Sequence, residues 1–198
     1  MTQTVLPFKL DATNDTLTDH VGLALIGEYG ESMELQSRIN SLLPGAKSSV
    51  GYSPFDYIYP LILTLHGGGK TIADLRTLRE DKVLQDLLKI ETIPSDNVYG
   101  DWLVRHGNTN GLSRLGEVLS ELSAVGLAND DITEYTLDLD ATQVIAEKQA
   151  AKFTYKGEKG YMPRVGHIAE NGPIIGDDFR AGNVAPATDN LGFIKYCE

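Results

Sequence analysis

The spacing of hydrophobic residues changes near residue 130. Before that point, apolar positions recur every three or four residues, as Leu112, Leu115, Leu119 and Leu122 do, and glycines and prolines separate the runs. This period is typical of short amphipathic helices. The predicted helices cover residues 18–29, 32–43, 54–65, 71–78, 81–88, 95–103 and 112–127, with N-caps at Thr18, Ser53, Thr71 and Asp81.

After residue 130 the pattern alternates, which predicts strands over residues 132–140, 161–169 and 174–179. Asn171-Gly172 lies between the last two strands and is a strong signal for a hairpin turn. The segment 189–196 has the pattern of a helix that is beginning. The sequence therefore predicts an α+β chain with an extended arm over 1–16, a helical domain over 17–130 that is a possible DNA-binding region, and an antiparallel sheet region over 131–198.

Composition and charge narrow the classes of function. The 198 residues include 17 Lys and Arg against 28 Asp and Glu, and the net charge of −11 argues against a generally basic nucleic-acid-binding protein. No apolar run approaches the roughly 20 residues that span a bilayer, and the N-terminus shows no secretory signal. A single cysteine, Cys197, fits a reducing compartment. We expect a cytoplasmic protein without membrane contact.

The strand 132–140 carries two carboxylates at positions that share one face. Alternation sends Asp138 and Asp140 to one side and the leucines between them to the other. Like charges on one face repel each other unless a cation or solvent lies between them. The two aspartates are therefore either metal ligands or part of the solvated face of an edge strand.

One local basic patch stands out in this acidic chain. Between residues 148 and 164, basic side chains outnumber acidic ones and alternate with Phe153, Tyr155 and Tyr161. Such a patch is either a clamp on DNA phosphates or a solvated charged loop. The candidate DNA-binding residues are Lys152, Lys156, Lys159 and Arg164.

Other signals favour structural roles. The glycine-rich stretch 66–71 lacks the spacing of a phosphate-binding loop and is predicted to end a helix. Residues 81–102 could form a helix-turn-helix, but acidic residues in the second helix favour a packing role. Apart from His66 in the glycine-rich stretch, the three remaining histidines, at 20, 106 and 167, show no metal-ligand spacing, so surface or core roles are expected for them. Cys197 is given no role.

Several short motifs occur in an order that resembles a known family. These are Asp140-Ala141-Thr142, the segments 155–161 and 179–184, and, earlier in the chain, residues 4–8, 65–69 and 94–103. Together they resemble insertion-sequence transposases of the DDE type (DDE transposase domain group 1) over essentially the whole chain. The resemblance implies an RNase H-like catalytic core, whose first three strands are antiparallel and whose fourth strand pairs in parallel with the first.

The resemblance also implies roles for particular residues. Asp140 matches the first catalytic, metal-binding aspartate, and Asp138 is the second candidate. The cofactor of the family is Mg²⁺ (or Mn²⁺), and two such ions roughly 3.5–4 Å apart activate the nucleophile and stabilise the leaving oxygen. The partners are DNA, at the terminal inverted repeats of an insertion element, and further copies of the enzyme in a homo-oligomer.

The family places its second aspartate and its glutamate after the part of the core that residues 131–198 match. We therefore expect an N-terminal fragment of a DDE transposase, inactive by itself, whose intact form cleaves and joins DNA. The alternatives are a non-catalytic DNA-binding or dimerising protein, or an inert remnant. The sequence does not specify the DNA end and target sequences, the oligomeric state, or whether the chain stops naturally at residue 198.

Overall fold

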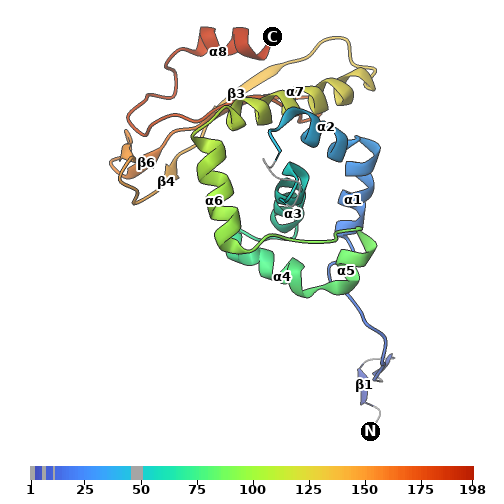
Figure 1. Cartoon of the computed structure of the whole chain (residues 1–198). Coiled ribbons are helices and arrows are strands. Elements are labelled where there is room, and N and C mark those ends of the chain that lie inside the picture. The colour runs from blue at the N-terminus through green and yellow to red at the C-terminus, as the bar shows by residue number, and fades with distance from the viewer. Residues whose placement is uncertain (1–2, 6–7, 11, 46–50) are drawn as a thin grey trace. The chain divides into compact units, whose positions relative to one another are not determined.

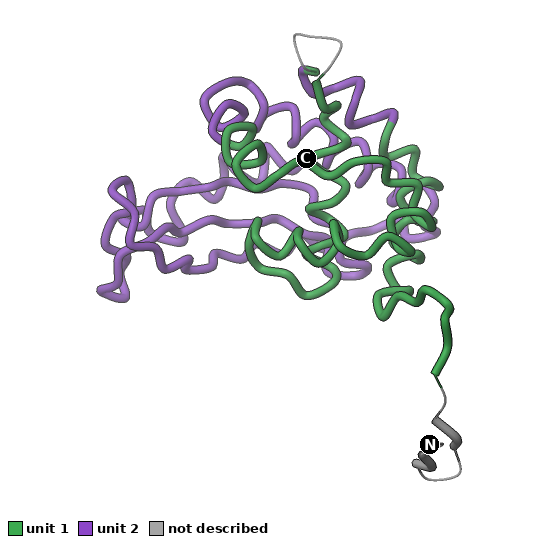
Figure 2. The backbone as a smooth tube through the Cα atoms, turned by 60° about the horizontal axis from the view of Figure 1, so that its bottom comes forward, with its two compact units in different colours: residues 1–36, 45–103 green, residues 37–44, 104–198 purple. Residues whose placement is uncertain are grey.

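The computed structural model describes residues 3–5, 8–10, 12–45 and 51–198 and shows a mixed α+β chain (Figure 1). Contacts divide the chain into two compact units (Figure 2). Unit 1 contains residues 1–36 and 45–103, and unit 2 contains residues 37–44 and 104–198. No helix in the described ranges has both the length and the apolar character that a membrane crossing requires.

The helices lie mainly in the first two thirds of the chain. They are α1 (Leu23–Ser32), α2 (Leu35–Leu42), α3 (Pro54–His66), the 3-10 helix η1 (Ile72–Asp74), α4 (Leu75–Glu80), α5 (Lys82–Leu87), α6 (Asp96–Gly107), α7 (Gly111–Ala128) and α8 (Asn190–Cys197).

The strands are short and pair only antiparallel. They are β1 (Gln3–Val5), β2 (Phe8–Leu10), β3 (Leu137–Ala141), β4 (Val144–Ile145), β5 (Lys152–Phe153), β6 (Lys159–Tyr161), β7 (Arg164–Ile168) and β8 (Ile174–Asp178). The pair β1–β2 lies in the predicted arm, part of which falls outside the described residues.

Three of the predicted N-caps are confirmed. Thr71 is the N-cap residue of η1, and its backbone N–H donates to the side chain of Asp74. Ser53 and Asp56 form a capping box at the start of α3, in which each side chain accepts a hydrogen bond from the other residue's backbone N–H. Asp81 accepts from the backbone N–H of Leu84 and begins α5. The predicted end of α3 is also confirmed, because Gly67 is its C-cap residue.

The N-cap predicted at Thr18 is wrong. Its hydroxyl donates a hydrogen bond to Asp81 and accepts one from the backbone N–H of His20, and α1 begins only at Leu23. Two apolar side chains of the predicted helix, Leu25 and Tyr29, are exposed.

Aromatic side chains form the core of unit 1. The ring of Tyr57 stacks on Trp102 with centroids 4.7 Å apart, and Tyr99 meets Tyr57 edge-on at 5.4 Å. Tyr99 is fully buried and donates its hydroxyl hydrogen to the carbonyl oxygen of Tyr57 (2.9 Å). Burial raises the pKa of Tyr99, so the phenol stays neutral and keeps this hydrogen bond.

Unit 2 is built around the antiparallel sheet β3-β7-β8, in which β7 is the central strand. The predicted hairpin is confirmed, because Gly172 adopts a positive φ of 83° and its N–H donates to the carbonyl oxygen of Ile168. The first strand is shorter than predicted and begins at Leu137. Before it, the side chain of Asp130 accepts from the N–H of Ile132, which holds that segment in a turn.

Helix α7 belongs with the sheet in unit 2, whereas the sequence places a boundary near residue 130. The hydroxyl of Ser123 donates to the carbonyl oxygen of Ile174 (2.8 Å), which joins α7 to β8. The sequence also did not predict the second sheet of unit 2, β4-β6-β5, because its strands are only two or three residues long.

Candidate functional site

The predicted aspartates lie on one exposed face of β3. Asp138 and Asp140 are exposed, while Leu137, Leu139 and Ala141 are half-buried, which matches the alternation read from the sequence. The Asp140 carboxylate accepts a hydrogen bond from the Thr142 hydroxyl (3.3 Å). Asp140 is therefore held near the end of β3 and remains open to solvent.

Strand register places further polar groups on the same face. Asp140 is opposite Val165, which is in turn opposite Asp177 on β8, and Asp138 is opposite His167. Side chains of directly paired residues share a face. The His167 Nε2 atom lies 3.8 Å from an oxygen of Asp138. This face, called the carboxylate face below, thus offers Asp138, Asp140, Asp177 and one imidazole.

The opposite face of the sheet is covered by α8. Gly166 and Gly176 are paired across β7 and β8, and the absence of side chains there makes room for Cys197. A Cβ atom at Gly166 or Gly176 would lie 2.8 or 2.7 Å from the Cys197 sulfur. Burial raises the pKa of the Cys197 thiol, so it is a packing group and not an activated nucleophile.

Arg164 does not belong to the predicted DNA-binding surface, because its side chain is only 6% exposed. Its guanidinium forms an ion pair with Asp178 (3.1 Å) and lies 4.2 Å above the Phe193 ring. The group also donates to the carbonyl oxygens of Thr188 and Asp189. Arg164 therefore fixes the chain that leads into α8.

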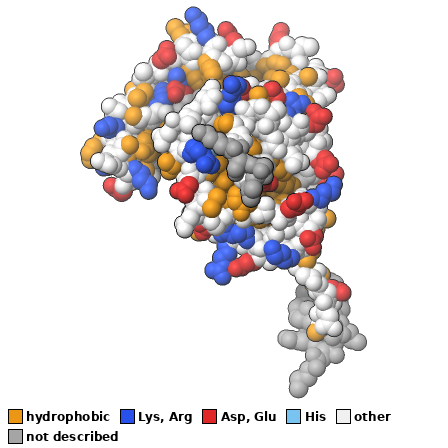
Figure 3. All heavy atoms as spheres, in the orientation of Figure 1, with side chains coloured by type: hydrophobic (Ala, Val, Ile, Leu, Met, Phe, Trp, Pro, Cys, Tyr) orange, Lys and Arg blue, Asp and Glu red, His pale blue; other side chains and the backbone are white. Residues whose placement is uncertain are grey.

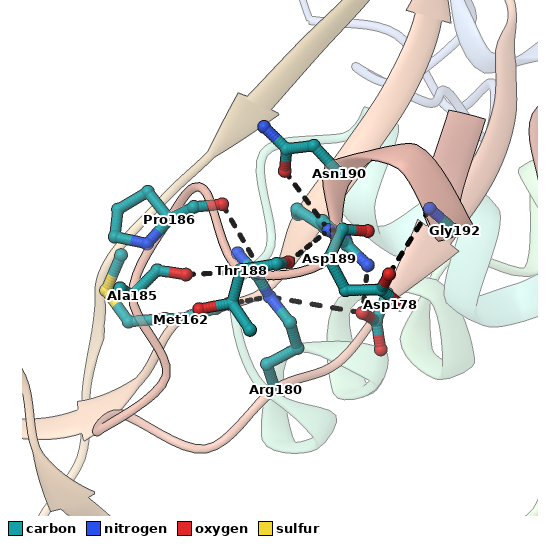
Figure 4. Close-up of polar contacts among 10 residues, drawn as sticks. Met162, Asp178, Arg180, Ala185, Pro186, Thr188, Asp189, Asn190 and Gly192 are labelled. Carbon is teal, nitrogen blue, oxygen red and sulfur yellow. Dashed lines mark hydrogen bonds and ion pairs between the residues drawn. The ribbon is translucent and has the colours of Figure 1, made fainter.

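Arg180 makes a second buried set of contacts in the same place (Figure 4). Its Nε donates to the carbonyl oxygen of Met162 (3.0 Å), and its Nη1 donates to backbone carbonyls between residues 185 and 188. Burial lowers the pKa of Arg180, and the neighbouring Arg164 lowers it further. The two arginines hold the 185–190 segment against the sheet of unit 2.

The three candidate lysines lie on or beside the β5–β6 hairpin. Lys152 is on β5, Lys156 is in the turn, and Lys159 is on β6. Between them, Phe153 and Tyr155 are 69% and 66% exposed. In Figure 3, hydrophobic and basic side chains lie together over β4 and β6. We call Lys152, Phe153, Tyr155, Lys156 and Lys159 the hairpin surface.

The structure brings together two motifs that are separate in the sequence. Tyr161 forms a β-bridge with Ala181, and its ring lies 4.9 Å from that of Phe179. The Met162 N–H donates to the carbonyl oxygen of Arg180. The segment 179–184 thus supports the base of the hairpin surface.

The glycine-rich stretch after α3 does not offer a phosphate-binding loop. The N–H groups of Gly67, Gly68 and Gly69 donate to carbonyl oxygens at the end of α3. Those of Lys70 and Thr71 donate to the carboxylate of Asp74 (2.8 Å each). With these donors occupied and an acidic group in place, the stretch is a helix end and turn, as predicted.

Two features of unit 2 can therefore support chemistry. The carboxylate face can hold a hard cation through oxygen ligands, and the hairpin surface can meet a polyanion that carries flat rings. No family model, curated protein or solved structure matches the chain.

Proposed function

We propose that residues 131–198 form the first part of an RNase H-like core of the DDE transposase type, and that the protein acts on DNA with Mg²⁺ or Mn²⁺. The observation that carries this proposal is the place of β3 in its sheet. The strand order is β3-β7-β8, so β3 pairs with β7 on one edge, and its other edge carries no strand in the described ranges. An RNase H-like core needs that edge for a parallel fourth strand, beside the first aspartate.

Asp140 is the proposed metal ligand, with Asp138 as the second candidate. Asp138 has a neighbouring imidazole, whereas the hydrogen bond from Thr142 leaves most of the lone pairs of Asp140 available to a cation. Asp140 and Asp177 flank Val165 on the same face. Two-metal cleavage needs further carboxylates, which the family supplies later in its core, so we expect residues 1–198 to bind metal weakly and not to cleave DNA.

Paramagnetic Mn²⁺ tests this assignment. In NMR spectra of the isotope-labelled chain, Mn²⁺ is expected to broaden the amide signals of residues 138–142 and of Asp177, because these lie around the carboxylate face. Asp140→Asn should abolish the broadening, and Asp138→Asn should reduce it. The matched control is Asp131→Asn, which removes the same charge from an exposed position before β3. Equal broadening in Asp140→Asn and in the unmodified chain would refute the assignment.

The hairpin surface supports a second part of the proposal, which is direct contact with DNA. Exposed aromatic rings provide a stacking platform for bases, and the lysines provide charge for phosphates. The Lys156 Nζ atom lies 5.7 Å from the Tyr155 ring centroid. A base stacked on the ring and a phosphate bound by the lysine would therefore be neighbours. This surface would also serve a non-catalytic DNA-binding protein, which is the alternative function.

Oligonucleotide binding measures the contribution of the hairpin surface. With a fluorescein-labelled single strand of mixed sequence, Tyr155→Ala should weaken binding by about 1–3 kcal/mol, the usual range for one stacked base. Lys156→Ala should instead reduce the slope of the logarithm of the binding constant against the logarithm of the salt concentration by about one, because one fewer counterion is released. Lys195→Ala, at an exposed position on α8, is the control and should leave both quantities unchanged. If Lys195→Ala and Lys156→Ala have equal effects, the hairpin surface is not the binding site.

A further inference from the structure

Unit 1 contains a group of potential metal ligands, none of which belongs to the carboxylate face. One ligand atom from each of Asp19, His20 and Asp81 lies within 4.8 Å of the other two, the only such group of three or more in the described residues. The His20 Nδ1 atom is 2.6 Å from an oxygen of Asp19 and 3.7 Å from an oxygen of Asp81. The three side chains come from the segment before α1 and from the N-cap of α5.

Hydrogen bonds hold Asp81 in place but leave the imidazole Nδ1 atom of His20 unsatisfied. The His20 Nδ1 atom is buried and has no hydrogen-bond partner, although an oxygen of Asp19 lies close to it. The 2.6 Å separation is within ion-pair distance, yet it leaves the Nδ1 atom without a contact of hydrogen-bond geometry. A buried nitrogen without a partner is otherwise unfavourable.

The Asp81 carboxylate adds a second negative charge to the group. Its side chain is 12% exposed, and hydrogen bonds from the Thr18 hydroxyl and the Leu84 N–H fix its two oxygens. Burial raises the pKa of Asp81, but these bonds and the neighbouring His20 together outweigh it and lower the pKa, so the group is ionised. No lysine or arginine of the described chain forms an ion pair with it.

Open space adjoins the group on two sides. A cavity of about 500 Å³ is lined by His20 and also by Thr64, whose side chain is nine-tenths buried and whose hydroxyl has no hydrogen-bond partner. A second hollow of about 280 Å³ is lined by Asp19, His20 and His66. Waters or a further ligand therefore have room to complete a coordination shell.

We propose that Asp19, His20 and Asp81 form a binding site for a divalent transition-metal ion of the zinc class. One imidazole nitrogen and two carboxylate oxygens suit Zn²⁺, whereas Mg²⁺ prefers a shell of oxygens alone. Three protein ligands leave a coordination position open. The ion would tie the segment before α1 to the start of α5, and it is separate from the Mg²⁺ or Mn²⁺ proposed at Asp140.

Calorimetric titration of the full chain with ZnCl2, with excess Mg²⁺ present, tests the proposal. We expect one Zn²⁺ per chain. Co²⁺ bound in its place should absorb visible light as a Co²⁺ ion of low coordination number does. Asp19→Asn and His20→Gln should each weaken Zn²⁺ binding by about 100-fold or more, since even loss of outer-shell partners costs about 10–100-fold. Asp19 is the preferred site for this test because its side chain is 89% exposed and its loss should leave the fold intact.

Asp15→Asn is the matched control, because it removes the same charge from an exposed position in the same segment. It should bind Zn²⁺ as the unmodified chain does. Circular dichroism of each variant without metal separates loss of the site from loss of the fold. The proposal is overturned if the unmodified chain takes up no Zn²⁺, if Asp19→Asn and His20→Gln bind it with unchanged affinity, or if Asp15→Asn is weakened as much as Asp19→Asn.

Discussion

Replacement of Arg164 by alanine is expected to lower the free energy of unfolding by about 3 kcal/mol, the upper end of the cost of leaving buried hydrogen-bonding groups without a partner. The side chain is almost completely buried and donates to the carbonyl oxygens of Thr188 and Asp189. Without it, these acceptors lose their partner and Phe193 loses the guanidinium stacked on its ring. Arg164 repels the neighbouring Arg180, so its removal also has a favourable effect. That effect offsets only part of the loss, because Asp178 lies 4.0 Å from Arg180 and already balances its charge. Urea denaturation followed by circular dichroism measures the change.

One further variant separates the geometry of the guanidinium from its charge, and a second serves as the exposed control. Arg164→Lys keeps the charge but not the planar set of donors that reaches several acceptors at once, so it should recover little of the loss. Arg76→Ala removes an arginine of the exposed pair with Glu80 and should leave the denaturation midpoint unchanged. A midpoint for Arg164→Ala equal to that for Arg76→Ala would mean that the buried cluster contributes nothing to stability.

Local sequence signals predicted those parts of the fold that depend on neighbouring residues. The capping box of Ser53 and Asp56 involves residues three apart, and the Asn171-Gly172 turn depends on the positive φ that glycine allows. The Thr18 prediction failed because its hydroxyl accepts from the N–H of His20 in a turn before α1 and donates to the distant Asp81. Hydrogen bonds between residues far apart in the chain cannot be read from spacing.

For the candidate sites too, the sequence predicted features set by neighbouring residues and not those set by residues far apart in the chain. Alternation along one strand correctly placed Asp138 and Asp140 on a shared exposed face. Their relation to Asp177 depends on the register of three strands, which the sequence does not contain. Arg164 follows the basic hairpin in the sequence, but its strand turns it toward the interior, so adjacency in sequence gave a wrong surface. Asp19, His20 and Asp81 were not predicted because their proximity arises only when the segment before α1 meets α5.

Gly182→Ala is expected to lower the free energy of unfolding by about 3 kcal/mol, at the upper end of the usual cost of overpacking. A Cβ atom at this position would overlap the backbone carbonyl oxygens of Lys152 and Gly160. These two residues are paired between β5 and β6, so neither carbonyl can move away without breaking the hairpin. Urea denaturation gives the stability, and amide hydrogen exchange in residues 152–161 shows whether the loss begins at the hairpin.

The same substitution at Gly126 should have the opposite sign, which makes the pair decisive. Gly126 lies inside α7, and nothing lies within 4 Å of the position of its Cβ atom. Alanine there should stabilise unit 2 by about 0.5–1 kcal/mol, because glycine loses more backbone entropy in a helix. Because the segment 179–184 supports the base of the hairpin surface, Gly182→Ala should also weaken oligonucleotide binding, whereas Gly126→Ala should not. If both variants unfold at the same urea concentration, the close approach of Gly182 to the hairpin does not constrain the fold, and the hairpin surface loses the support on which its proposed role depends.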